Sequence, residues 1–218
     1  MSKVYESLEG QIFPQVKAQV IKSLKGGEGT VTKKCLALIP FLNRNADQLT
    51  RTVLMSLSED VRRQTAPACQ KGCDECCSMK VRALQPELIL IAEFLEKNLS
   101  PELFKAQIEK LSETVDQLAA CQSEREELKV ACSFLDNGAC SIYDVRPLTC
   151  RAWNSTEHQA CIDYLERKDV PIPTSICHFA AYDIIKKGVE EGLEESGIYP
   201  ALIELNQGVL NIMNQKRN

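Results

Sequence analysis

Cysteines are crowded into two short stretches of this chain, and the crowding constrains the fold more than any other feature of the sequence. The chain has 218 residues and 11 cysteines. The first stretch, CQKGCDECC, holds four thiols, and a longer second stretch holds four more. The eight residues are Cys69, Cys73, Cys76, Cys77, Cys132, Cys140, Cys150 and Cys161. Buried free thiols or disulfides are the alternatives, but ordinary core cysteines do not gather in this way. We therefore predict that these eight thiols are metal ligands.

The redox environment decides whether clustered thiols form disulfides or bind metal. The N-terminal residues show no basic segment followed by an apolar one, so we expect no signal peptide. No apolar run approaches the ~20 residues that span a bilayer, so we expect no membrane partner. These observations favour a cytoplasmic location, which is reducing, and there clustered thiols bind metal more often than they pair.

The spacing of the thiols limits the kind of metal site. Zinc and iron–sulfur clusters both take several thiolates, and two residues between cysteines let one loop present two sulfurs to one ion. Cys76 and Cys77 are neighbours, and neighbouring side chains diverge on a helix or a strand. Eight thiols are also twice what one Cys₄ site needs. We therefore expect zinc or iron, including an iron–sulfur cluster, in a polynuclear centre or in two sites.

Charge adds two expectations. The chain has 26 Lys and Arg against 30 Asp and Glu, a formal net charge of −4, so nucleic acid is excluded as a main partner. Several thiolates together are strongly anionic, and nearby cations should offset their charge. The candidate cations are Lys71, Lys80, Arg82, Arg146 and Arg151.

Apolar residues at helical spacing predict a mostly α-helical bundle in which the two Cys-rich loops meet at a metal centre. We expect a single domain over residues 1–218, with a metal-binding core at 69–161 and flanking helices within 1–25 and 199–218. Pro14 suits the first turn of the N-terminal helix, and Ser100 suits the N-cap of another. Further helices are expected around 49–61, 85–99, 156–167, 176–193 and 200–213. Strand signal is weak, at 80–84 and 141–143 only, and Asn137-Gly138 is a turn dipeptide.

The second stretch, CSFLDNGACSIYDVRPLTCRAWNS, together with CQKGCDECC, resembles the YkgJ-like cysteine-cluster family. Its members are described as zinc- or iron-chelating proteins with a CxxCxxCC motif. The resemblance implies metal ligation by Cys73, Cys76, Cys77, Cys132, Cys140 and Cys150, joined by Cys69 and Cys161. The chain departs from the pattern at one point, because three residues rather than two separate Cys69 from Cys73.

Three functions remain open. In the first, the thiolates hold a metal that is structural or is handled by the protein. In the second, the chain is an enzyme, either a transferase or a redox protein, whose cluster organises an adjacent pocket. In the third, the metal stabilises a module that docks a protein partner. The family resemblance allows a transferase, since related proteins include a flagellin lysine methylase. No nucleophile, phosphate or dinucleotide motif is present, so we assign no catalytic residue. We expect Cys35, Cys121 and Cys177 to act as small apolar residues, with His158 and His178 as less favoured ligands.

Overall fold

The computed structural model describes residues 2–26, 28–70, 72–166 and 170–217, which form two compact units. Unit 1 comprises Met1–Cys69, Leu148–His158 and Ile172–Ala201, and unit 2 comprises Gln70–Pro147, Gln159–Pro171 and Leu202–Asn218. Each unit is assembled from three separate segments, and the expectation of a single domain stays a prediction. The predicted fold class is confirmed, because the chain is mostly α-helical with small two-stranded sheets. Among the described residues, no helix has the length and apolar character that crossing a membrane requires.

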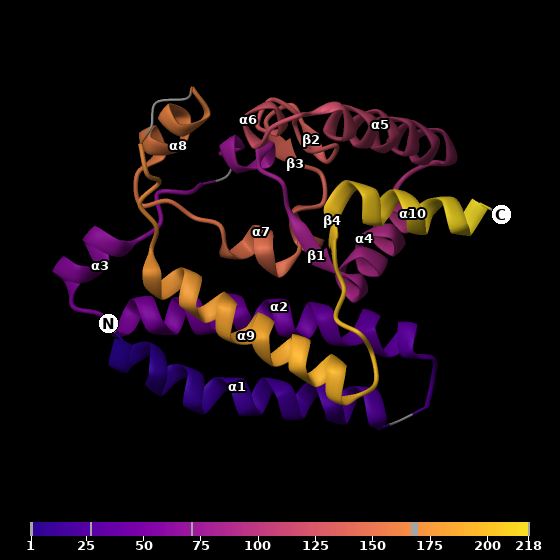
Figure 1. Ribbon diagram of the computed structural model, residues 1–218. Helices are drawn as coiled ribbons and strands as arrows, with labels where there is room; N and C mark the ends of the chain where they lie inside the picture. Colours follow the sequence, from indigo (N-terminus) through magenta and orange to yellow (C-terminus); the bar gives the residue numbers. More distant parts are fainter. Residues whose placement is uncertain (1, 27, 71, 167–169, 218) are drawn as a thin grey trace. The chain divides into compact units, whose positions relative to one another are not determined.

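Unit 1 is built on three long helices that lie side by side (Figure 1). They are α1 (Ser2–Lys25), α2 (Val31–Ser56) and α9 (Ile176–Glu195), and the unit also contains α3 (Glu59–Thr65) and α7 (Leu148–Ala152). Apolar residues at helical spacing, such as Val20 of α1, Leu42 of α2 and Ile184 of α9, are fully buried. Burial of these stripes drives the packing. The short helix α7, which carries Cys150 and Arg151, packs against α9.

Two helix boundaries in unit 1 differ from the sequence prediction. Pro14 lies inside α1 rather than in its first turn. Proline cannot donate to the carbonyl of Gly10, four residues earlier, but Gly10 is exposed and water can take the donor's place. The helix predicted around 49–61 is two helices, because the backbone of Leu57 is extended and separates α2 from α3.

Two glycines let α1 and α9 approach closely. Gly188 and Gly192 lie one turn apart on α9 and are buried. A Cβ at Gly188 would lie 2.9 Å from the Cβ of Val16, and one at Gly192 would lie 2.6 Å from that of Val20. Any larger residue would therefore push the two helices apart.

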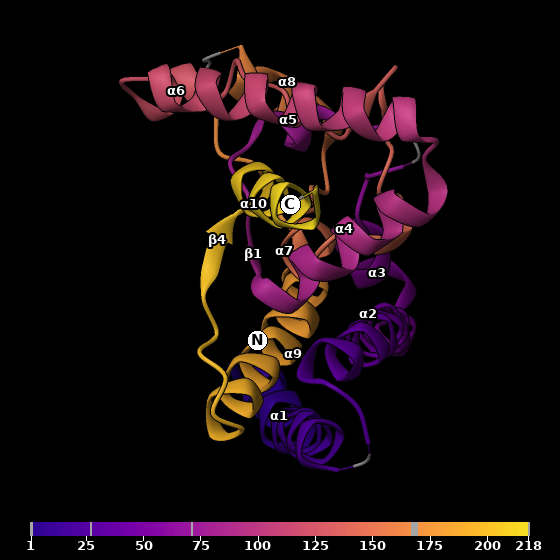
Figure 2. The same cartoon turned by 90° about the vertical axis from the view of Figure 1, so that its right-hand side faces the viewer.

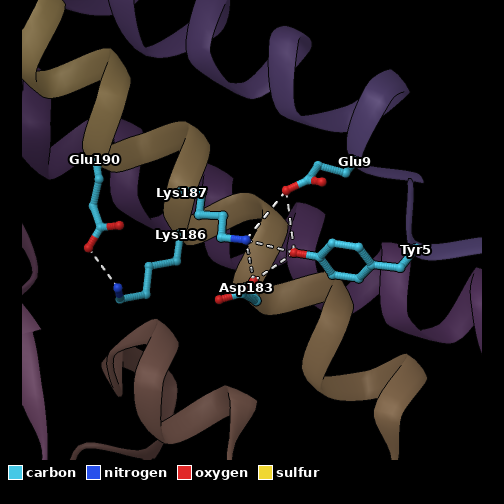
Figure 3. A network of polar contacts seen from close by, with 6 residues as sticks. All are labelled: Tyr5, Glu9, Asp183, Lys186, Lys187 and Glu190. Carbon is cyan, nitrogen blue, oxygen red and sulfur yellow. Dashed lines mark hydrogen bonds and ion pairs between the residues drawn. The ribbon is translucent and has the colours of Figure 1, made fainter. Parts of the chain in front are cut away.

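A polar network joins the start of α1 to the middle of α9 (Figure 3). Lys187 donates to the hydroxyl of Tyr5 at 2.8 Å and lies 3.0 Å from Asp183 Oδ2 and 3.4 Å from Glu9 Oε1. Tyr5 in turn donates to Asp183 at 2.8 Å. Lys187 and its two carboxylate partners are partly exposed, so these ion pairs add little to the stability of the α1–α9 contact and serve mainly to orient α1.

Unit 2 contains the first cysteine stretch from Gln70 onward and most of the second, together with short elements and three longer helices. The helices α4 (Gln85–Asn98) and α5 (Pro101–Ala120) pack against the C-terminal helix α10 (Leu205–Arg217) (Figure 2). The predicted N-cap is confirmed, since the side chain of Ser100 accepts from the N–H of Leu103. The remaining elements are η1 (Glu75–Ser78), β1 (Arg82–Leu84), α6 (Glu124–Glu127), β2 (Leu135–Asp136), β3 (Ala139–Cys140), η2 (Tyr143–Val145), β4 (Leu202–Glu204) and, from Gln159 onward, α8 (His158–Leu165).

Two small antiparallel sheets hold these elements in register. β1 pairs with β4, with Arg82 opposite Glu204, so the predicted C-terminal helix begins only at Leu205. β2 pairs with β3 through the predicted turn, in which Asn137 and Gly138 both have positive φ. The strand expected at 141–143 lies slightly earlier, because pairing with β2 ends at Cys140 and Tyr143 begins η2.

Candidate metal centre

Four of the eight predicted ligands lie in unit 2 near enough for their charges to influence one another. They are Cys76, Cys77, Cys132 and Cys140, which we call the four-thiol cluster. The charges of Cys76, Cys132 and Cys140 all act on Cys77 and raise its pKa. None of the eleven cysteines, all of which lie within the described residues, forms a disulfide, so the sulfurs of the cluster are not oxidised. The cluster draws on three chain segments, which local sequence alone cannot join.

The first segment is the tight turn of η1. The N–H of Cys77 donates to the carbonyl of Asp74 at 2.8 Å, and the N–H of Met79 donates to that of Cys76 at 3.1 Å. Mutual interaction between the adjacent Cys76 and Cys77 thiols, mainly by hydrogen bonding, lowers the pKa of Cys76 to about 7 and raises that of Cys77. The divergence expected of these neighbouring side chains stays a prediction.

The second and third segments are the turn at Cys132 and the hairpin that follows it. The N–H of Cys132 donates to the carbonyl of Cys77 at 2.7 Å, which joins the two cysteine stretches through the backbone. The carbonyl of Cys132 accepts from the N–H of Leu135 at 2.9 Å, and Leu135 pairs with Cys140 across the β2–β3 ladder. The hairpin therefore returns Cys140 to the neighbourhood of Cys132.

The surroundings of Cys132 shift the pKa of its thiol in both directions. Burial raises the pKa of Cys132 to about 12, and the nearby charges of Cys140 and Glu204 act in the same direction. The backbone N–H of Phe134 donates to the sulfur and lowers the pKa, as does the charge of Lys110. An N–H donor aimed at a buried sulfur stabilises its thiolate, the form that binds metal.

Arg146 supplies positive charge to the cluster, as one of the predicted cations. Its charge lowers the pKa of Cys76. Its guanidinium lies over the ring of Tyr143, 4.2 Å from the centroid. This contact limits the positions that the charged group can take. Lys80 instead forms an ion pair with Glu127 at 2.7 Å, and Lys71 lies outside the described residues.

Two further predicted ligands lie in unit 2. The thiol of Cys73 donates to Glu75 Oε2 at 3.1 Å, beside η1. Cys161 is buried on α8. Ligation by these two residues stays a prediction.

The last two predicted ligands belong to unit 1. The sulfur of Cys69 is exposed and accepts from the N–H of Ser155 at 3.3 Å. Cys150 lies half-buried on α7. Ligation by Cys69 and Cys150 likewise stays a prediction.

Arg151, which follows Cys150, is part of a polar network in unit 1. Its guanidinium pairs with Asp47 at 3.0 Å, and its carbonyl accepts from Nε2 of His178 at 2.8 Å. The hydroxyl of Tyr182 donates to the same Asp47 carboxylate. The sequence prediction placed Arg151 beside thiolates, and it missed Asp47 because no local motif connects α2 with α7.

The three isolated cysteines lie on helices or at their ends. Cys35 is buried in α2, and burial raises the pKa of its thiol. The thiol of Cys121 donates to the carbonyl of Gln117 at 3.2 Å, one turn earlier. Cys177 is half-buried near the start of α9.

The donor set of the four-thiol cluster fits a soft metal ion. Four sulfurs are the complete ligand set of a tetrahedral zinc site and also suit iron–sulfur centres. Crowded thiols without a cation raise one another's pKa, as Cys77 shows, whereas a bound cation reverses that effect.

Comparison with known families agrees with this chemistry. Residues 68–178, half of the chain, match the family model described as "CxxCxxCC: Putative zinc- or iron-chelating domain". The chain belongs to this family. The match spans both cysteine stretches and ends at His178, before β4 and α10. No curated protein and no solved structure matches the chain.

Proposed function

We propose that this CxxCxxCC-family chain binds a zinc or iron ion through the thiolates of Cys76, Cys77, Cys132 and Cys140. The observation that carries the proposal is the gathering of these thiols within one unit, with the backbone bond from Cys132 to Cys77 between the two stretches. Their number and chemistry match what a four-coordinate soft cation requires.

Zinc is the ion we place first. Four thiolates complete its coordination without any further component, whereas an iron–sulfur cluster also needs inorganic sulfide. A zinc ion held by four thiolates is closed to substrate, and it contributes folding free energy on the order of 10 kcal/mol. The role that follows is structural, or the holding of the metal itself.

The surrounding residues would prepare the cluster for an ion. The N–H of Phe134 faces the sulfur of Cys132, and Arg146 places positive charge near Cys76. Both favour thiolate over thiol before metal arrives. The interaction between the Cys76 and Cys77 thiols lowers the pKa of Cys76 and raises that of Cys77, so an ion that binds both sulfurs must displace the proton of Cys77.

The test is purification without oxygen, followed by elemental analysis, an acid-labile sulfide assay and a visible absorption spectrum. About one zinc per chain, with neither sulfide nor colour, supports a closed zinc site at the four-thiol cluster. About two zinc ions per chain would extend the site to the other predicted thiols. Iron with matching sulfide and broad visible absorption would replace zinc by an iron–sulfur cluster. A chain that takes up neither metal, even after reconstitution, overturns the proposal.

A further inference from the structure

A buried asparagine of the C-terminal helix faces the turn that carries Cys132. Asn206 is 5% exposed and lies in the first turn of α10. Its Oδ1 accepts from the hydroxyl of Ser133 at 2.8 Å, from the N–H of Ser133 at 3.1 Å and from the thiol of Cys132 at 3.8 Å. Three donors from two consecutive residues of the second cysteine stretch thus converge on one oxygen.

The other end of the same amide is also fixed. Nδ2 of Asn206 donates to Glu204 Oε1 at 2.8 Å, while Glu204 Oε2 accepts from the N–H of Gln207 at 2.8 Å. With Nδ2 committed to Glu204, the oxygen must face Cys132 and Ser133. The amide therefore has one orientation.

The segment that carries Asn206 is anchored to the chain that follows the first cysteine stretch. Glu204 pairs with Arg82 in the β1–β4 ladder, and the N–H of Leu205 donates to the carbonyl of Val81 at 2.9 Å. β1 begins five residues after Cys77 in the sequence. One C-terminal segment consequently contacts the chain beside both cysteine stretches.

We infer that Asn206 is a positioning residue for the Cys132 ligand, supplied by a helix outside the matched domain. The inference rests on the proposed function. The protonated Cys132 thiol donates to Oδ1 of Asn206. When that proton leaves and the sulfur binds an ion, the two Ser133 donors still hold the oxygen, so the turn keeps its place. Side chains that orient a ligand in this way commonly change metal affinity by about 10–100-fold when removed.

The experiment is a titration of the full-length chain with Co²⁺ and then Zn²⁺, comparing wild type with Asn206→Ala. Cobalt bound by thiolates absorbs strongly, so its spectrum reports how many sulfurs bind and in what geometry. We expect Asn206→Ala to keep its helical circular dichroism, to alter the sulfur-to-cobalt absorption and to bind Zn²⁺ about 10–100-fold more weakly. A spectrum and an affinity equal to wild type would overturn the inference.

Two controls separate positioning from loss of stability. Asn211→Ala, on an exposed part of α10, should match wild type in spectrum and affinity. Leu111→Ala, in the core of the same unit, should lower the melting temperature of the metal-free chain while its bound cobalt keeps the wild-type spectrum.

A milder variant covers the case in which Asn206→Ala does not fold. Ser133→Ala removes only the hydroxyl donor to Oδ1 and should shift the cobalt spectrum in the same direction by a smaller amount. An unchanged spectrum for Ser133→Ala would then overturn the inference. If the wild-type chain binds neither ion, the proposed function is overturned, and the inference is overturned with it. If the wild-type chain binds both ions, the proposed function stands and the variants alone test the inference.

Discussion

The backbone N–H of Cys132 donates to the carbonyl of Cys77 at 2.7 Å, and this bond joins two cysteine stretches that α4 and α5 separate along the chain. Each partner is itself a predicted ligand, so the bond sets the distance between two donors by the backbone rather than by flexible side chains. Under the proposed ligation, this bond would hold two ligating segments in place before the ion arrives and lower the ordering cost of binding.

Replacing a thiol of the four-thiol cluster should abolish metal retention. We expect Cys76→Ser to lose the bound metal and to unfold the turn of η1, because metal binding and local folding are coupled. Cys35→Ser is the matched control, since Cys35 is buried in α2 of the other unit, and it should keep the full metal content. Elemental analysis of the purified variants checks both. Stoichiometric metal in Cys76→Ser would show that the ion sits elsewhere.

Metal affinity should fall as the pH falls. Burial and neighbouring thiols raise the pKa of Cys132 and Cys77, so the metal-free cluster carries protons that the ion must displace. Each displaced proton changes the affinity about tenfold per pH unit. Cys76, with a pKa of about 7, adds to this slope only below neutral pH. Competition with a chelator of known affinity at several pH values measures the slope, and a pH-independent affinity would contradict thiol ligation.

The effect of Arg146 on metal affinity should come from its positive charge rather than from the shape of its side chain. Arg146→Ala removes the cation that favours the Cys76 thiolate, and we expect about tenfold weaker Zn²⁺ binding and slower alkylation of Cys76 near neutral pH. Arg146→Lys keeps the charge and should retain most of the affinity. Lys105→Ala, which removes an exposed charge from α5, should change neither quantity. Equal Zn²⁺ affinities for Arg146→Ala and wild type would show that the charge of Arg146 does not contribute to metal binding.

Two glycines should respond to alanine with opposite signs. At Gly192 the new Cβ would lie 2.6 Å from the Cβ of Val20 and 3.1 Å from the carbonyl oxygen of Lys17, so Gly192→Ala should destabilise unit 1 by about 1–3 kcal/mol. At Gly10, exposed in α1, nothing lies within 4 Å, so Gly10→Ala should stabilise the helix by about 0.5–1 kcal/mol. Thermal unfolding followed by circular dichroism measures both. A stabilised Gly192→Ala would mean that α1 and α9 do not pack closely in solution.

The features that the sequence determined by itself are the local ones. Ser100 before Pro101 begins α5, and Asn137-Gly138 makes the β2–β3 turn, because capping and positive φ depend on residues a few positions apart. The cysteine spacing likewise indicated the family, and residues 68–178 match its model, because clustered thiols are chemically distinctive; ligation by the individual thiols stays a prediction.

The tertiary structure decided which distant residues meet. The bond from Cys132 to Cys77, the contact of Asn206 with Ser133 and the pair of Arg151 with Asp47 each join residues far apart in the sequence. It also divided the eight predicted ligands, six in unit 2 and Cys69 and Cys150 in unit 1. Spacing along the chain could not show this, because contacts of that kind form only when buried helix faces and strand pairing fix the path of the chain.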